Sequence, residues 1–182
     1  MSVHSLYAVS PIDGRYASRT KNLQPFFSEA ALMRYRVRIE IEYFIALCQT
    51  QVPPLTQLSA KDITSLRKVY QDFSSEDTKE IKETERTTNH DVKAVEYFVK
   101  DKLQALGLDK HLEFVHFGLT SQDINNTAIP LAIKEAVEMV YLPELNKLKQ
   151  QIGILAEKWK KIPMLARTHG QPATPTRLGK EL

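Results

Sequence analysis

Cysteine is scarce in this 182-residue sequence, and long apolar segments and a large excess of one charge are missing. Cys48 is the only cysteine, so it cannot form an internal disulfide and supplies no thiolate cluster for a metal ion. No run approaches the roughly twenty apolar residues that cross a bilayer. The first residues, MSVHSLYAVSPIDGRY, lack the basic and hydrophobic stretches of a secretory signal, and His4 is interpreted as a surface residue. These absences favour a cytoplasmic protein with no membrane partner.

Charge is balanced along the chain and is not gathered in one place. The 25 Lys and Arg residues are interspersed with 22 Asp and Glu residues, which gives a net charge of +3. This distribution provides no basic arm or stripe for nucleic acid, but it is compatible with a small anionic ligand. The sequence also contains no Gly-rich phosphate loop, no nucleophile elbow and no Ser/His/Asp arrangement.

A helical pattern extends over most of the chain. Between Ser28 and about Gln49, apolar residues recur on one helix face: Val37, Ile41, Phe44, Ile45 and Cys48. Three pairs have the spacing of an N-cap and an acid at the third helical position: Ser59 with Asp62, Ser74 with Asp77, and Thr88 with Asp91. A second apolar face then ends at Gly107, a typical helix stop; it contains Val92, Val95, Val99, Leu103 and Leu106.

The pattern changes after the connecting segment 107–119. Thr120 or Ser121 is expected to cap a long helix that is interrupted or kinked at Pro130 and near Pro143, unless Pro143 begins a new helix. A heptad-like seam typical of helical bundles follows: Leu145, Leu148, Ile152, Leu155 and Trp159. Past Pro163 we expect an extended segment, and then a further helix that begins at Thr174-Pro175.

These patterns predict an all-α fold with two domains. Residues 1–111 would form a small N-terminal helical domain, and residues 112–182 would begin a long central helical bundle. Because the last predicted helix has barely two turns before Leu182, we expect the chain to be part of a longer protein.

Polar residues gather at predicted helix starts and in the segment that leads into one. TTNHD occupies residues 87–91, TSQD residues 120–123 and RTHGQPATP residues 167–175. A helix N-terminus presents unpaired N–H groups and a partial positive charge, so three such ends could together hold a polyanionic substrate. The alternative is that these residues simply cap helices, and for TSQD the pattern alone favours capping.

Two histidines are candidate functional residues. His90 lies between Asn89 and Asp91 without an evident apolar partner, and His169 precedes Gly170, which permits close backbone approach to a ligand. An imidazole in a loop stiffened by prolines suits a proton donor, although a lone loop histidine is more often a surface residue.

Four further residues are less distinctive. His111 and His116 have no carboxylate or thiol company, so we expect no metal site there, and His116 is interpreted as a packed, hydrogen-bonded residue that could also line the site. Arg15 and Tyr16 follow an Asp-Gly turn. Arginine can make bidentate contacts to phosphate and tyrosine adds a hydroxyl, whereas the turn alone favours a solvated surface arginine.

Four segments together resemble the adenylosuccinate lyase family of the fumarase/aspartase superfamily. They are SPIDGRY, ERTTNHDVKAVEYF, EFVHFGLTSQDINN and RTHGQPATPTRLGKE, in the family's order and with comparable spacing. NHDVKAVEYF and THGQPATP carry most of the likeness, whereas GRY and TSQD are weak on their own. The resemblance covers nearly the whole chain and corresponds to the amino-terminal portion of such an enzyme.

The resemblance implies a β-elimination that releases fumarate, from adenylosuccinate to give AMP and from the succinylated carboxamide ribotide to give its free amide. A base takes a proton from the succinyl carbon beside a carboxylate, and an acid protonates the departing nitrogen. By resemblance, His169 is that acid. The implied substrate contacts are Arg15 and Tyr16 at the nucleotide end, Thr120 and Ser121 at the succinyl carboxylates, and Asn89, His90 and Asp91 near the reacting centre. Lys93, Thr168 and Gln171 are candidate further contacts, and no cofactor or metal is expected.

The family's base is a serine on a mobile loop with a serine-rich, Met-Pro-Lys-containing signature, which does not occur before Leu182. The family also forms homotetramers in which several subunits build each active site around the central bundle. We therefore expect this chain alone to be inactive. The competing interpretations are a sister fumarate-releasing lyase of the argininosuccinate lyase, aspartase or fumarase type, and a non-catalytic helical scaffold built on the seam of residues 145–159.

Overall fold

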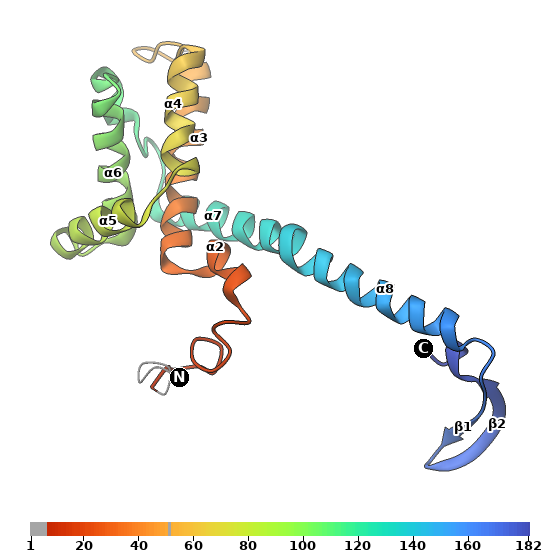
Figure 1. Cartoon of the computed structure of the whole chain (residues 1–182). Coiled ribbons are helices and arrows are strands. Elements are labelled where there is room, and N and C mark those ends of the chain that lie inside the picture. Colours follow the sequence, from red (N-terminus) through yellow and green to blue (C-terminus); the bar gives the residue numbers. More distant parts are fainter. Residues whose placement is uncertain (1–6, 51) are drawn as a thin grey trace. The chain divides into compact units, whose positions relative to one another are not determined.

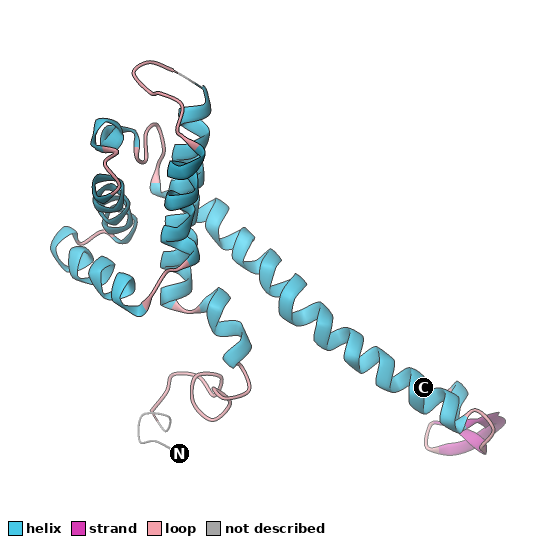
Figure 2. Cartoon of the chain, turned by 45° about the horizontal axis from the view of Figure 1, so that its top comes forward, coloured by secondary structure: helices cyan, strands magenta, loops and turns pink. Residues whose placement is uncertain are grey.

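The computed structural model describes residues 7–50 and 52–182, so the interpretation of His4 lies outside the described residues. Helices make up most of the structure, which confirms the predicted all-α class (Figures 1 and 2). In chain order the elements are η1 (Lys21–Leu23), α2 (Gln24–Phe27), α3 (Glu29–Thr50), α4 (Ala60–Gln71), α5 (Ser75–Thr88), α6 (Asp91–Ala105), η2 (Asp109–Phe114), α7 (Ser121–Ala136), the π-helical segment η3 (Val137–Tyr141), α8 (Leu142–Trp159), β1 (Pro163–Thr168), β2 (Gln171–Arg177) and η4 (Leu178–Lys180).

The chain divides into two compact units, Met1–Ala136 and Val137–Leu182. The first unit contains the helices α2 to α7, and the second contains η3, α8, the hairpin of β1 and β2, and η4. The predicted domains, residues 1–111 and residues 112–182, differ from these two units in their boundary and remain a prediction.

Helix α3 is the centre of the core of the first unit. Its predicted apolar face is buried along its whole length, from Val37 to Cys48. Helices α4, α6 and α7 pack against it, and α5 packs against α6. The face predicted for α6 is also buried, except that Leu106 is 38% exposed because it is the C-cap residue and Gly107 follows with a φ of +74°.

The start signals of the short helices were predicted correctly in two of three cases. Ser59 with Asp62 and Ser74 with Asp77 form complete capping boxes, which confirms both predictions. The third prediction, at Thr88, is wrong because α5 continues through Thr88. Its C-cap is the next residue, Asn89, and the N-cap of α6 is His90.

Helix α7 runs without a break through Pro130, so the predicted interruption at that residue is wrong. Proline removes one hydrogen bond to the preceding turn, but Pro130 is exposed, so the carbonyl that loses its partner can be hydrated. In the second unit, η3 precedes α8, and Pro143 lies in the first turn of α8. Tyr141, which precedes α8, has helical φ and ψ, so Pro143 does not begin a separate helix; the interruption predicted near Pro143 corresponds to the π-helical segment η3.

The segment after Pro163 is extended as predicted, but the helix predicted at Thr174-Pro175 is wrong. Both residues belong to β2, which pairs with β1 in antiparallel register, with Pro175 opposite Leu165. A two-stranded sheet has an unpaired edge on each strand, so the missing proline N–H is tolerated there. After β2, η4 packs on α8, where a Cβ added to Gly179 would lie 2.1 Å from the backbone oxygen of Ala156. No helix in the described part of the chain is long and apolar enough to cross a membrane.

Candidate functional site

The tight corner between α5 and α6 carries the triplet Asn89, His90 and Asp91. Asn89 has a φ of +50°, a left-handed conformation that asparagine tolerates better than most residues. His90 then begins α6, and its Nδ1 accepts the backbone N–H of Lys93 at 3.1 Å. Because Nδ1 accepts this hydrogen bond, the proton of the neutral ring lies on Nε2. Nε2 is 3.5 Å from the hydroxyl oxygen of Ser121, at the start of α7.

Asp91 is anchored to the core of the first unit through an almost buried arginine. The guanidinium of Arg36, 7% exposed, contacts Asp91 at 2.7 Å and also donates to the side-chain oxygen of Asn125 at 2.9 Å. Burial alone would raise the pKa of Asp91, but the Val92 N–H and the charge of Arg36 outweigh it and lower the pKa. Arg36 therefore joins α3, α6 and α7, and it already engages the carboxylate of Asp91.

The start of α7 is capped by its own residues. Thr120 donates to Asp123 twice, from its backbone N–H at 2.7 Å and from its hydroxyl at 2.9 Å. Thr120 and Asp123 of the TSQD segment therefore cap α7, as the pattern predicts. The donors of Thr120 are therefore occupied, and Ser121 is the residue of this pair whose hydroxyl lies beside His90.

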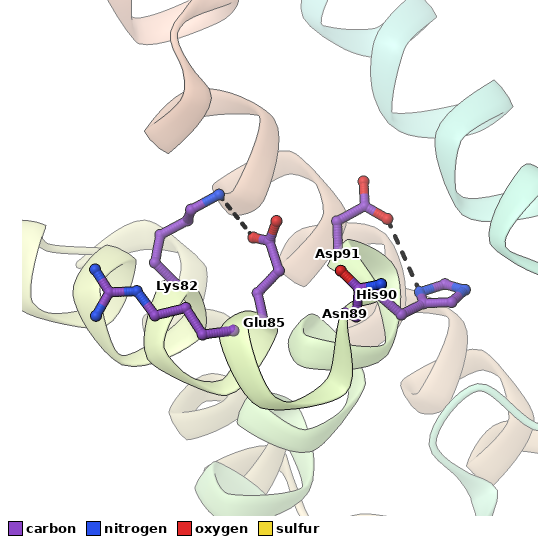
Figure 3. A pocket seen from close by; sticks show the side chains of 6 residues that line it. Lys82, Glu85, Asn89, His90 and Asp91 are labelled. Carbon is purple, nitrogen blue, oxygen red and sulfur yellow. Dashed lines mark ion pairs between the residues drawn. The ribbon is translucent and has the colours of Figure 1, made fainter.

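Two grooves meet at His90. The first, named here the Ser121 groove, has a volume of about 330 Å³ and is lined by His90, Val92, Lys93, Glu96, His116, Leu119, Thr120 and Ser121. The second, the Arg86 groove, has a volume of about 460 Å³ and is lined by Lys82, Glu85, Arg86, Asn89, His90 and Asp91 (Figure 3). His90 thus separates two groups of polar side chains in the first unit.

The cations of the Arg86 groove already have carboxylate partners. Lys82 contacts Glu85 at 2.8 Å and Glu29 at 3.2 Å, and Arg86 contacts Glu83 at 2.7 Å. An anion in this groove would compete with these ion pairs.

The lysine of the Ser121 groove shares its carboxylate partner with a second lysine that does not line the groove. Lys93 contacts Glu96 at 2.8 Å, and the same carboxylate also contacts Lys100 at 3.0 Å. Burial would raise the pKa of Glu96, but the two lysines outweigh burial and lower this pKa. The single negative charge of Glu96 is therefore shared between the positive charges of Lys93 and Lys100. The hydrogen bond to Glu96 in turn raises the pKa of Lys93 and keeps it charged. Of the two grooves, the Ser121 groove is the better site for a carboxylate or phosphate.

His116 lines the Ser121 groove and is packed and hydrogen-bonded as predicted, but the expectation that it has no carboxylate nearby is wrong. Its side chain is 16% exposed, and its Nδ1 lies 2.5 Å from Oε1 of Glu40, a fully buried residue of α3. His111 is buried, and its Nε2 lies 3.3 Å from the hydroxyl of Thr56. Among residues 7–50 and 52–182, no group of three or more His, Cys, Asp or Glu side chains is arranged to hold a metal ion.

Sequence reasoning missed three buried charged residues in and around the Ser121 groove: Arg36, Glu40 and Glu96. A signal for two of them was present. Glu40 lies on the apolar face of α3, three residues after Val37 and four before Phe44, and Glu96 interrupts the apolar face of α6. A charged residue on a core-facing helical stripe indicates a buried charge with a partner.

His169 lies in the second unit, at the tip of the hairpin. His169 and Gly170, with φ values of +48° and +78°, are the two loop residues between β1 and β2, and the flanking Thr168 pairs with Gln171. Two successive positive φ values define a type I′ turn, so Gly170 is explained by the turn itself. All four residues are exposed, and the imidazole of His169 is open to solvent.

Arg15 and Tyr16 lie in a series of turns before η1 in the first unit. The guanidinium of Arg15 covers the ring of Tyr16 at 4.7 Å, and both side chains are exposed. Neither residue lines the Ser121 groove or the Arg86 groove. The structure therefore brings together Asn89, His90, Asp91, Lys93, Thr120 and Ser121, and it places Thr168, His169 and Gln171 at one hairpin.

The sequence model of a family described as "Lyase" matches residues 14–182, so the chain belongs to this lyase family. Among curated relatives, it is 51% identical to an adenylosuccinate lyase from Dictyostelium discoideum, 47% identical to one from Vibrio cholerae and 44% identical to one from Escherichia coli K12. Each match covers the whole of this chain and 40% of the relative. The chain thus spans about 40% of the length of the curated relatives it matches.

Solved structures show the same fold. A fumarate lyase from Mesorhizobium sp. BNC1 superposes with a TM-score of 0.68 at 18% identity, over 88% of this chain and 35% of that one. A 3-carboxy-cis,cis-muconate lactonizing enzyme from Pseudomonas putida gives a TM-score of 0.60 at 18% identity, over 98% of this chain and 37% of that one. At this identity the likeness concerns the fold alone.

Proposed function

We propose that this chain is part of an enzyme of purine biosynthesis that cleaves adenylosuccinate to AMP and fumarate. The same enzyme would release fumarate from the succinylated carboxamide ribotide. The observation that carries the proposal is the 51% identity, over the whole chain, to a relative named adenylosuccinate lyase. The Ser121 groove supports it, because residues from two of the four resembling segments meet there.

The substrate would bind through its carboxylates in the Ser121 groove. The Nε2–H of His90, the hydroxyl of Ser121 and the ammonium of Lys93 are donors of the kind that hold a succinyl carboxylate. Thr120 is a weaker candidate than Ser121 for this contact, because its backbone N–H and its hydroxyl both donate to Asp123. Ser121 is therefore the stronger of the two predicted carboxylate contacts.

The remaining predicted residues take supporting parts in this proposal. Asn89 and Asp91 hold the corner that presents His90, and Asp91 does so through its contact with Arg36. Arg15 and Tyr16 would contact the nucleotide end of the substrate, where a guanidinium suits phosphate. Both are exposed and therefore available.

The elimination requires two proton transfers, one from the substrate to a base and one from an acid to the leaving group. A base takes a proton from the succinyl carbon beside a carboxylate, the C–N bond breaks, and an acid returns a proton to the departing nitrogen. We assign the acid to His169, whose exposed imidazole at a two-residue turn can approach a bound substrate. Thr168 and Gln171 flank that turn and would contact the same part of the substrate. The base is assigned to no residue of this chain.

The proposal includes a homotetramer in the cytoplasm. The exposed apolar residues of α8, among them Leu145, Leu148 and Ile152, support an assembly that covers them. A sister lyase that releases fumarate from another succinyl compound is the second candidate, because one solved structure with this fold is a fumarate lyase from Mesorhizobium sp. BNC1.

The test is an assay of fumarate release from adenylosuccinate, with argininosuccinate as the matched substrate control. We expect activity in the complete gene product, little activity in the 182-residue chain, and a loss of at least about a hundredfold in His169→Ala of the complete product. Release from argininosuccinate alone would assign a sister lyase. Ready turnover by the 182-residue chain that His169→Ala abolishes would contradict the expectation that this chain is incomplete.

A further inference from the structure

The pair formed by Glu40 and His116 has no part in the function proposed above. Glu40 is fully buried on α3, and one of its oxygens, Oε1, lies 2.5 Å from Nδ1 of His116. Its other oxygen, Oε2, is buried and has no hydrogen-bond donor among the described residues. A buried carboxylate with one unsatisfied oxygen is costly, so a purely structural role is a poor explanation for it.

The backbone at His116 is also unusual. His116 has a φ of +60°, and Gly118 follows with a φ of +71°. A left-handed conformation at a non-glycine residue costs about 1 kcal/mol or more and persists only where its surroundings hold it. Here the hydroxyl of Tyr43 donates to the carbonyl oxygen of Phe117 at 2.8 Å and helps to hold the segment. This conformation places the His116 ring between buried Glu40 and the Ser121 groove.

The two histidines of the groove are held by opposite kinds of partner. Nδ1 of His90 accepts a backbone N–H, so it carries no proton. Nδ1 of His116 faces a carboxylate, which is only an acceptor when it is ionised, so the proton between them belongs on the nitrogen. Burial raises the pKa of Glu40, and the hydrogen bond from His116 opposes that rise.

We propose that Glu40 is a positioning residue for the Ser121 groove: it accepts a hydrogen bond from protonated Nδ1 of His116 and leaves Nε2 as the ring nitrogen available to a ligand. A carboxylate behind an imidazole is a well-known way to fix ring orientation and to confine proton exchange to one nitrogen. The groove then presents a donor, Nε2–H of His90, and an acceptor, Nε2 of His116, which suits a ligand that carries a carboxylate together with an N–H or O–H group. The kinetic part of the test rests on the proposed function, and the spectroscopic part does not.

The spectroscopic test is long-range ¹H–¹⁵N NMR of the chain labelled at histidine, with His116→Gln to assign the signal. We expect protonated Nδ1 at His116 and unprotonated Nδ1 at His90. In Glu40→Met, which removes the acceptor and keeps the length, the neutral His116 ring should move its proton to Nε2. Glu42→Met, which removes an exposed-side carboxylate from the same helix, should leave His116 unchanged. An unprotonated Nδ1 at His116 of the wild type overturns the proposal, even if Glu40→Met does not fold.

The kinetic test uses the complete gene product. Glu40→Met should raise KM roughly tenfold or more with a smaller change in kcat, because it misplaces an imidazole that contacts the bound substrate. Glu40→Gln keeps an oxygen that can accept from Nδ1 and should reverse most of that change. Equal activity of Glu40→Met and Glu42→Met, or no recovery in Glu40→Gln, overturns the proposal. A wild type that releases no fumarate contradicts the proposed function, and the NMR result then still decides the role of Glu40.

Discussion

The two units of the chain differ in what their helices bury. In the first unit, α3 and α6 enclose a continuous apolar core, and every buried apolar residue of the described chain belongs to this unit. In the second unit, all of whose residues are described, none is buried, and α8 exposes most of its predicted seam. An isolated helix gains little stability from its own hydrogen bonds. The first unit is therefore stabilised by its packed core, whereas the second unit has no buried residue that could stabilise it in the same way.

The same difference extends to the candidate functional residues. Side chains around the Ser121 groove are fixed by buried partners, such as Arg36 behind Asp91 and Glu40 behind His116. His169 is fixed by the geometry of a two-residue turn, with no buried partner behind it. Substitutions should therefore act through packing in the first unit and through backbone conformation in the second.

The largest expected effect is the loss of a core side chain from the first unit. Phe44→Ala removes a fully buried ring from α3 and should lower the free energy of unfolding by about 3–5 kcal/mol. Ile152→Ala, on the exposed seam of α8, should change it by less than about 0.5 kcal/mol. Urea unfolding followed by far-UV circular dichroism measures both. A loss at Ile152 that grows with protein concentration would break the comparison and show that a second copy covers α8.

The second-largest expected effect is a loss of activity with little change in stability. His90→Asn replaces the imidazole with asparagine, a preferred N-cap residue, so α6 should keep its start. In the complete gene product, fumarate release should fall by about a hundredfold in kcat/KM, which corresponds to about 2.7 kcal/mol. Thermal unfolding is the control and should change little. Unchanged activity would remove His90 from the site and leave it as a capping residue only.

The success of the predictions from sequence also differs between the two units. The apolar faces of α3 and α6 were predictable because a long helix with one buried face repeats its pattern over several turns. The hairpin turn was missed, and Thr174-Pro175 resembled a helix start, because two residues carry little information and strand pairing is decided by a distant segment. The triplet Asn89, His90 and Asp91 was found, but the buried partners that hold it come from helices elsewhere in the chain.

Two glutamates on α3 should respond to pH in opposite directions. Burial raises the pKa of Glu40 above the usual value of 4.5, so its folded form loses stability as pH rises through the folded pKa. Glu40→Gln removes this cost and should stabilise the chain at neutral pH, by about 1–2 kcal/mol for relief of an unsatisfied buried charge. The gain should shrink as pH falls towards 4.5.

Glu42 is the matched control for this prediction. The hydrogen bond from Arg67 lowers the pKa of Glu42, so its contribution to stability is present above pH 4.5 and disappears as pH falls through the folded pKa. Glu42→Gln should therefore destabilise the chain at neutral pH, and the difference should vanish in acid. Thermal unfolding between pH 3 and pH 8, values chosen to span the usual carboxyl pKa, gives both curves. Curves of the same sign would mean that Glu40 is not held as a buried carboxylate.

The smallest expected effect separates chemistry from conformation at the hairpin. Asparagine before glycine is the preferred pair for a type I′ turn, whereas histidine at a φ of +48° is strained. His169→Asn should therefore stabilise the hairpin by about 0.5–1 kcal/mol, and Gly170→Ala, at a φ of +78°, should destabilise it by about 1 kcal/mol. Trp159, the only tryptophan, reports on the second unit by fluorescence during unfolding. If His169→Asn also abolishes fumarate release, the reaction requires the imidazole of His169 as a proton donor. Histidine then occupies this turn although asparagine suits its backbone conformation better. A variant that is both more stable and fully active would leave His169 without a role in the reaction.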